Sequence, residues 1–384
     1  MVTSALLGLV LVSSPAADDF GKLWEQCAQS IRGQYWARKT RGPEMEALLK
    51  KYADRAKGAK SRAEFSAAVN AMIDEFKDSH FEFLGDDRQG YYLFDGLARK
   101  EATPMPHIGA WFKPASDGYT VTMVLDGFEA ERAGLRKGDV IVSIDGEEFT
   151  PVTSLKPRVD KQATLKVRRG SQTLDAKVEV GSKPAMDLFL EATRNSARVI
   201  EDDGKKIGYV HLWTQANERF INALHGLVYG KFRDTDAMIL DLRDGFGGRP
   251  EAYADPFFRP DVKLEWNFGE RTTMRQDFGY GRPLIVLINE GSRSAKEVLS
   301  FILKKSGRAT LVGSTTAGDV LGTGPFRVAD WAYLEIPMVD LKVDGERIER
   351  AGVTPHFPVP QEHDDAGNDL HLAKALEVLR GKLK

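Results

Sequence analysis

The strongest constraint on the fold is a regular alternation of short apolar runs and helical stretches towards the C terminus. The apolar runs of strand length are 207–212, 237–241, 284–288 and 310–312. The stretches with helical spacing of apolar residues are 216–229 and 295–305. Strand and helix signals that alternate in this way predict an α/β unit with buried strands. Residues 185–384 are therefore expected to form one α/β core.

Two differently patterned regions precede this core. Apolar residues recur at three- and four-residue steps from Phe20 to Ile31 and from Phe65 to Phe76, which predicts helices. Between about 103 and 180, short alternating strands are separated by turns, and a single short helix fits at 131–134. A length of 384 residues suggests two to three domains. The expected units are a helical cap (18–102), a mostly-β module (103–184) and the core (185–384).

Charge and cysteine content exclude several classes of function. The chain has 54 Lys and Arg against 56 Asp and Glu, so no bulk basic field is present to hold nucleic acid or an anionic membrane. Cys27 is the single cysteine, so an intrachain disulfide is excluded by count, as are zinc sites that need four cysteines or two cysteines with two histidines. Binding is therefore expected to come from local sites.

The first 17 residues have the pattern of a secretory signal peptide. They carry no charged side chain, run apolar from Ala5 to Val12, and end in the small-residue stretch 13–17. The alternative is a buried N-terminal helix. No other apolar run reaches the 18 residues that a membrane span needs, so no stable membrane span is expected. The sequence thus predicts export to the periplasm or the extracellular space.

The segment 130–146 resembles the most recognisable part of a bacterial PDZ domain. Within it, 133–134 ends a short helix, 137–138 makes a turn, and 145–146 is a hairpin signal. The segment 107–112 lies where such domains place the loop whose N–H groups capture a peptide C-terminal carboxylate, by strand addition and an anion nest. The resemblance implies that role for Ile108, Gly109 and Ala110. The alternative is a degenerate PDZ domain that serves as a lid or spacer.

The run 284–288 leads into a turn that carries two serines and then into the helical stretch. A serine at a strand-to-helix turn has an exposed hydroxyl, and the following N–H points at the same spot. A nucleophile and an oxyanion donor then come as one unit. The non-catalytic alternative makes Ser294 a helix N-cap, with Glu297 at the capping-box spacing. Gly247 and Gly248, after the run 237–241, can point N–H groups into the same site or simply form a tight turn.

Four segments, in order, resemble the C-terminal processing and tricorn family of serine peptidases: 78–80, 239–248, 288–297 and 347–355. The resemblance covers nearly the whole chain and implies an α/β (α+β) peptidase core of the crotonase-like ββα type, with an N-terminal helical cap and an inserted mostly-β PDZ domain. It implies that Ser294 is the nucleophile, with Ser292 as the competing assignment. It also implies that the Ala295 N–H is one oxyanion donor and that Gly247 or Gly248 supplies the second.

The chain departs from one branch of that family at the catalytic base. C-terminal processing peptidases carry a lysine 25 residues after the serine, where this chain has Asp319. The tricorn-like branch uses a histidine supported by a glutamate, and His80 and Glu349 match those positions. Glu349 is expected to orient His80 directly or through the Ser79 hydroxyl. Lys296, beside the nucleophile, is expected to be solvated at the start of the helix rather than to act as the base.

The resemblance therefore implies a serine-type endopeptidase with a Ser/His/Glu set rather than a Ser/Lys dyad. Its substrates would be extended or unfolded peptides and proteins, recognised by a free C terminus through the PDZ domain. No metal or organic cofactor is required. The alternatives are a catalytically inactive family member that binds hydrophobic ligands or peptides, and an adaptor that acts through its PDZ module.

Overall fold

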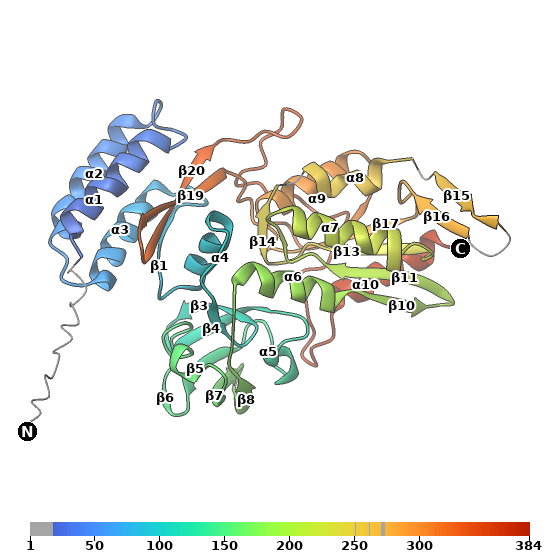
Figure 1. Cartoon of the computed structure of the whole chain (residues 1–384), viewed down its shortest axis with the longest axis horizontal. Coiled ribbons are helices and arrows are strands. Elements are labelled where there is room, and N and C mark those ends of the chain that lie inside the picture. Colours follow the sequence, from blue (N-terminus) through green and yellow to red (C-terminus); the bar gives the residue numbers. More distant parts are fainter. Residues whose placement is uncertain (1–17, 250, 261, 270–272) are drawn as a thin grey trace, which may run out of the picture.

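The computed structural model describes residues 18–249, 251–260, 262–269 and 273–384. The predicted signal peptide at 1–17 lies outside the described residues. Figure 1 shows three groups of elements: a helical region that begins near the N terminus, a mostly-β module below it, and an α/β core beside both. Among the described residues, no helix combines the length and apolar character needed to cross a membrane.

The helical region contains the predicted helices and rests on a small sheet. Asp19 and Ser61 accept N–H groups at the starts of α1 and α3, which are satisfied N-caps. The helices share one apolar cluster with the three-stranded antiparallel sheet β1-β20-β19. The chain turns between α3 and β1, and this turn carries Ser79 and His80. The elements are α1 (Phe20–Gln34), α2 (Gly42–Lys57), α3 (Arg62–Phe76), β1 (Glu82–Gly85), β19 (Gly322–Ala329) and β20 (Ala332–Val339).

The mostly-β module has its own core and is reached through α4 (Gln89–Ala98). Its antiparallel sheet has the order β3-β4-β5-β7-β8, with β6 paired to β5, so β3 is an edge strand. The short β2 and β9 pair at the two ends of the module. Its elements are β2 (Met105–His107), β3 (Ala110–Ala115), β4 (Gly118–Val124), α5 (Glu129–Arg132), β5 (Val140–Ile144), β6 (Glu147–Glu148), β7 (Gln162–Arg169), β8 (Gln172–Glu179) and β9 (Gly181–Lys183).

The core is a six-stranded sheet with the order β10-β11-β13-β17-β18-β21, parallel except for β10. Every residue of β13 and β17 is buried, as their apolar runs predict. One face shares an apolar cluster with α10, and the other with α6, α7 and α9. The elements are β10 (Arg198–Asp202), β11 (Lys205–His211), β13 (Ala237–Asp241), β17 (Leu284–Ile288), β18 (Thr310–Gly313), β21 (Phe357–Pro358), α6 (Ala185–Ser196), α7 (Glu218–Gly226), α9 (Ala295–Lys305) and α10 (Leu370–Lys382).

Parallel strands bring their carboxyl ends to one edge of the sheet, which is where sites form in open α/β folds. The segment after β13 runs into β14 (Phe246–Gly248), which pairs with β12 (Thr214–Gln215). The turn 289–294 follows β17 at the same edge. The fold thus brings together the two predicted chemical segments, although they are some forty residues apart in the chain.

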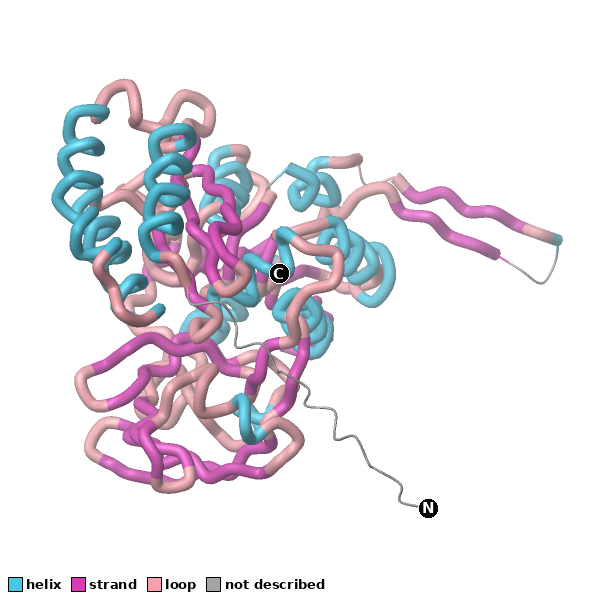
Figure 2. The backbone as a smooth tube through the Cα atoms, turned by 60° about the vertical axis from the view of Figure 1, so that its left-hand side comes forward, coloured by secondary structure: helices cyan, strands magenta, loops and turns pink. Residues whose placement is uncertain are grey.

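A hairpin that sequence analysis did not predict projects from the core after α8 (Glu251–Phe258). It consists of β15 (Lys263–Asn267) and β16 (Thr273–Asp277), and Figure 2 shows it extending away from the other elements. Leu264, Trp266 and Met274 are among its exposed apolar residues. Its strands are joined by residues 268–272, which include Gly269 but not the two-residue Asn-Gly or Asp-Gly turn that signals a hairpin most strongly, and this explains the omission.

Candidate active site

Ser294 lies in a strained turn between β17 and α9. Its backbone has φ 58° and ψ −129°, a left-handed conformation that costs free energy in a residue with a side chain. The Ser294 N–H donates to the Asp319 carbonyl at 2.8 Å and to Glu297 Oε2 at 3.1 Å. These two acceptors hold the strained residue in place. The strand, turn and helix therefore form as predicted, and Glu297 provides its half of the capping box.

Ser292 has a different environment from Ser294. It is fully buried, its hydroxyl donates to the Leu242 carbonyl at 2.8 Å, and it accepts the Asn289 N–H at 3.0 Å. Ser294, in contrast, lines a cavity of about 880 Å³. Ser292 is therefore a structural part of the turn, and of the two serines only Ser294 is open to a bound molecule.

The two glycines of β14 face different neighbours. A Cβ atom added to Gly247 would lie 2.5 Å from Ser294 Cβ, 2.7 Å from its Oγ and 2.8 Å from the Ala295 nitrogen. A Cβ atom added to Gly248 would instead lie 2.0 Å from the Gln215 carbonyl oxygen, on the neighbouring strand. Gly247 is thus the residue in direct contact with the Ser294 side chain and the Ala295 N–H. This close approach excludes any side chain at position 247.

His80 lines the same cavity as Ser294, and it comes from the turn between α3 and β1. Burial and the nearby Arg293 charge lower the pKa of His80 to about 3. The imidazole is therefore neutral at pH 7, the form that can accept a proton. In the part of the chain that the structure describes, no hydrogen bond joins His80 to Ser294.

Ser79 connects His80 to Glu349. The Ser79 hydroxyl lies 3.3 Å from His80 Nδ1 and donates to Glu349 Oε1 at 3.0 Å. The other carboxylate oxygen of Glu349 accepts the Val320 and Leu321 N–H groups at 2.7 and 3.2 Å. Of the two arrangements left open above, the structure contains the bridged one. Glu349 itself is held by backbone donors, so its position does not depend on the histidine.

The cavity has a volume of about 880 Å³ and is shared by all three parts of the molecule. His80 comes from the helical region, Ser294 and Gly247 from the core, and Trp111 and Phe112 from β3 of the mostly-β module. The Trp111 ring also contacts the Phe246 ring, with centroids 5.8 Å apart. The module therefore forms one wall of the site rather than a separate body.

The position that would carry a lysine base holds Asp319, which lines the cavity and whose pKa is raised by burial. The prediction that Lys296 is solvated is wrong. Its side chain is fully buried, and Nζ donates to the carbonyl oxygens of Asp244 at 2.6 Å and Arg243 at 3.3 Å. The reason is that the turn 243–245 covers the first turn of α9 and closes it from solvent.

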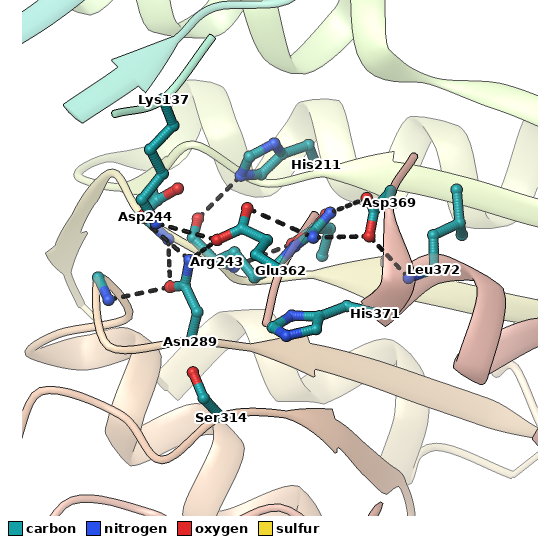
Figure 3. A network of polar contacts seen from close by, with 12 residues as sticks. Lys137, His211, Arg243, Asp244, Asn289, Ser314, Glu362, Asp369, His371 and Leu372 are labelled. Atoms are coloured by element: carbon teal, nitrogen blue, oxygen red, sulfur yellow. Dashed lines mark hydrogen bonds and ion pairs between the residues drawn. The ribbon is translucent and has the colours of Figure 1, made fainter. Parts of the chain in front are cut away.

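A polar network joins the mostly-β module to the core (Figure 3), and one of its members, Asp244, also lines the cavity. Lys137 Nζ donates to Asp244 Oδ1 at 2.8 Å and to Glu362 Oε2 at 3.0 Å, and Asn289 Nδ2 donates to the same two carboxylates. Burial opposes the charge on Glu362, but Arg243 and Lys137 lower its pKa to about 2. Sequence analysis missed this network because Lys137 and Glu362 carry no local signal of a partner.

The predicted carboxylate-binding residues of the module are buried at the bend 108–109 and at Ala110, the first residue of β3. Ile108 and Ala110 are each 1% exposed, and Gly109 packs under Phe128. The free edge of β3 beside this bend is occupied by Gln89 of α4. Gln89 Nε2 donates to the Ala110 carbonyl at 2.9 Å, and its Oε1 accepts the Phe112 N–H at 3.0 Å. One carboxamide thus satisfies a donor and an acceptor that an added peptide strand would use.

Comparison with protein families identifies two segments. Residues 206–359 match the peptidase family S41, and residues 106–180 match the PDZ domain family. A carboxyl-terminal-processing protease of Synechocystis is 26% identical over 283 residues, which cover 70% of this chain and 66% of the relative. A probable CtpA-like serine protease of Staphylococcus aureus is 27% identical over 338 residues, with 81% and 63% covered. The chain therefore spans slightly less than two thirds of the length of these relatives.

Solved structures show a similar fold. The photosystem II D1 C-terminal processing protease superposes with a TM-score of 0.56 at 21% identity, over 90% of this chain and 94% of that one. The tricorn protease superposes with a TM-score of 0.57 at 19% identity, over 95% of this chain and 37% of that one. At these identities the likeness concerns the fold alone.

Proposed function

Because the chain carries a peptidase family S41 segment joined to a PDZ domain, we propose that it is a serine-type endopeptidase that hydrolyses peptide bonds in extended or unfolded polypeptides. The observation that carries the proposal is the contact of Gly247 with both the Ser294 side chain and the Ala295 N–H. At this point of the cavity, a hydroxyl and the backbone of two segments converge. That is the arrangement needed to attack a carbonyl and to stabilise the resulting oxyanion.

In this proposal His80 is the base. It takes the Ser294 proton during attack on the scissile carbonyl and returns it to the leaving amine. Ser79 and Glu349 orient the imidazole and stabilise its charge, which is the tricorn-like arrangement rather than a Ser/Lys dyad. Because His80 and Ser294 face one cavity without a hydrogen bond, their contact is expected to tighten when substrate enters, as is common at catalytic sites. The N–H groups of Ala295 and Gly247 hold the oxyanion, and Gly248 is the weaker candidate.

The bridging role of Ser79 leads to a test of the base. Ser79→Ala and Glu349→Gln should each lower kcat by about 10²-fold, the usual contribution of a positioned general base. The double variant should be no worse than either single one, because both substitutions break the same chain of contacts. The measurement is kcat and KM on one peptide. Glu346→Gln, in an exposed ion pair with Lys305, is the matched control. Additive losses would contradict the bridge.

We further propose that an extended segment with a free C terminus binds along β3, near Ile108, Gly109 and Ala110. The proposal is supported by the position of β3 as an edge strand that lines the same cavity as Ser294. Such a segment must displace Gln89, which uses the Ala110 carbonyl and the Phe112 N–H. Peptides and proteins are thus the expected partners.

Removing the Gln89 side chain should therefore strengthen peptide binding. In a Ser294→Ala background, Gln89→Ala is expected to lower the Kd of a labelled peptide with a free C terminus about tenfold. The reason is that the two competing hydrogen bonds of Gln89 are removed, a combined net gain of about 1.4 kcal/mol. Fluorescence anisotropy measures the change. Gln172→Ala, at an exposed position on β8, is the control, and an amidated peptide tests the carboxylate. Unchanged or weaker binding would assign Gln89 a purely structural role.

The remaining expectations are part of the same proposal. We propose that 18–102 form a cap, 103–184 the PDZ domain and 185–384 a peptidase core of the crotonase-like ββα type. We also propose that residues 1–17 direct export to the periplasm or the extracellular space. The uncharged apolar run within those residues supports export.

The experiment that tests the proposed function is incubation of the purified protein with a pool of peptides that have free C termini. Mass spectrometry should detect internal cleavage products, and a fluorophosphonate should add once to the protein and stop cleavage. A folded protein that neither cleaves the pool nor reacts with the probe would overturn the proposal. It would favour the alternative of an inactive relative that binds hydrophobic ligands or peptides.

A further inference from the structure

Lys296 is a buried lysine that has no carboxylate partner at contact distance within the described part of the chain. It is 0% exposed and lies two residues after Ser294, in the first turn of α9. Its Nζ contacts two backbone carbonyl oxygens, and none of the ion pairs among the described residues includes it. Asp241 and Asp244 act on its charge only from a longer distance, and burial lowers the pKa of Lys296 to about 7. A lysine in such a place costs stability, because its charge is desolvated and lies near a helix N-terminus.

The two acceptors belong to the segment that leads to the predicted oxyanion donor. The carbonyls of Arg243 and Asp244 lie between β13 and β14, directly before Gly245. Gly245 has φ 71°, and a Cβ atom there would lie 2.9 Å from Lys296 Nζ. The side chain therefore crosses from the helix of Ser294 to the turn that precedes Gly247. It joins the segments that carry Ala295 and Gly247, whose N–H groups are the predicted oxyanion donors.

The geometry also separates Lys296 from the base. Its side chain does not line the cavity that holds Ser294 and His80, among the residues that the structure describes. Its N–H donors point towards carbonyl oxygens on the side of α9 covered by the turn. An ammonium has three donors and no acceptor, so it suits a group of carbonyl oxygens. Lys296 is therefore placed to hold the backbone of the turn 243–245, and not to remove a proton from Ser294.

We propose that Lys296 is a positioning residue of the oxyanion hole, which sets the distance between the Ala295 N–H and the Gly247 backbone by holding the turn 243–245 against α9. The proposal rests on the proposed peptidase function. The oxyanion is stabilised only when both donors point at one oxygen atom, so a small shift of β14 weakens the transition state more than the bound substrate. Lys296 thus affects the chemical step without touching the substrate.

The test is Lys296→Met in the full chain, because methionine has a similar length but no N–H donor. We expect kcat to fall about 100-fold, the loss seen when one oxyanion donor is removed, with KM unchanged within about twofold. The affinity for a peptide aldehyde, whose adduct with Ser294 carries the oxyanion, should fall by a similar factor. The Kd of the uncleaved peptide, measured in a Ser294→Ala background, should stay constant.

Lys304→Met is the matched control. Lys304 is on the same helix and also donates to a backbone carbonyl, that of Thr354 at 2.6 Å, but neither residue lines the cavity. It should leave kcat and aldehyde affinity unchanged. If Lys296→Met does not fold, Lys296→Gln replaces it, because glutamine keeps an N–H donor without the charge. Lys296→Gln should then retain more activity than Lys296→Leu, which has no donor.

Three results would overturn the proposal. Unchanged kcat in Lys296→Met would remove the positioning role. An equal loss of peptide affinity and kcat would assign Lys296 to general stability, as would a lower melting temperature that fully accounts for the lost activity. If the wild-type protein does not cleave peptides at all, the proposed function fails first, and the aldehyde comparison then has no basis.

Discussion

The Ser294→Ala variant is expected to lose measurable hydrolysis while keeping its fold and its affinity for peptides. In serine peptidases, removal of the nucleophile costs about 10⁶-fold in kcat, because no other group can form the covalent intermediate. Ser294 lines the cavity, and its backbone N–H donates to the Asp319 carbonyl and to Glu297, contacts that do not involve its side chain. Alanine should therefore leave the turn intact.

The matched control is Ser292→Ala, which removes a hydroxyl from the same turn. Ser292 holds the Leu242 carbonyl and the Asn289 N–H, so its loss should cost about 1–3 kcal/mol of stability and only part of the activity. Cleavage of one fluorogenic peptide and thermal unfolding of both variants decide the assignment. Full activity in Ser294→Ala, or complete loss in Ser292→Ala with the fold retained, would show that the wrong serine has been assigned.

Gly247→Ala is the second substitution with a large expected effect. The new methyl group would lie 2.5 Å from Ser294 Cβ and 2.8 Å from the Ala295 nitrogen, well inside van der Waals contact. Both neighbours are backbone or near-backbone atoms on a strained turn, so they cannot rotate away as the end of a long side chain could. We expect kcat to fall by about 10³-fold, because the oxyanion donors are pushed apart and the hydroxyl is displaced.

Gly226→Ala provides the control for this effect, because a Cβ atom at Gly226 meets nothing within 4 Å at the end of α7. It should keep full activity and be slightly more stable, as glycine is unfavourable in helices. The measurements are kcat on one peptide and circular dichroism, which reports whether each variant is folded. A folded Gly247→Ala protein with wild-type kcat would show that this glycine is not part of the oxyanion hole.

The local elements of the core could be predicted because each is encoded in a short segment. The runs 237–241 and 284–288 are strands with the predicted bounds, and α9 spans the predicted 295–305. Continuous apolar residues of this length favour a strand buried on both faces, and helical periodicity after a polar turn favours a helix. The pairing of β1 with β20 was not predicted, since nothing local signals a partner some 250 residues away. The hairpin β15–β16 is local, and it was missed because several residues separate its strands in the sequence instead of a two-residue turn.

The candidate site also has features that the sequence predicted and features that only the structure showed. The residue types and their order along the chain were readable from the sequence: a serine between strand and helix, two glycines after a strand, and the pair Ser79 and His80. Their spatial convergence was expected only through the family resemblance. The bridge from Glu349 through Ser79, and the contact of Gly247 rather than Gly248 with Ser294, required coordinates.

The sequence by itself determined the buried strands, the strand-to-helix turn that carries Ser294 and the helix that follows it, because these depend on neighbours within a few residues. The positive φ of Ser294 also depends on the Asp319 carbonyl, which the tertiary structure supplies. Only the tertiary structure decided that Lys296 is buried, that Gln89 covers the edge of β3 and that Lys137 reaches the core. A polar side chain near a helix start is normally hydrated, and its sequence neighbours do not change that. Its environment changes when a distant segment covers it and supplies carbonyl or carboxylate oxygens, and that packing is a property of the whole fold.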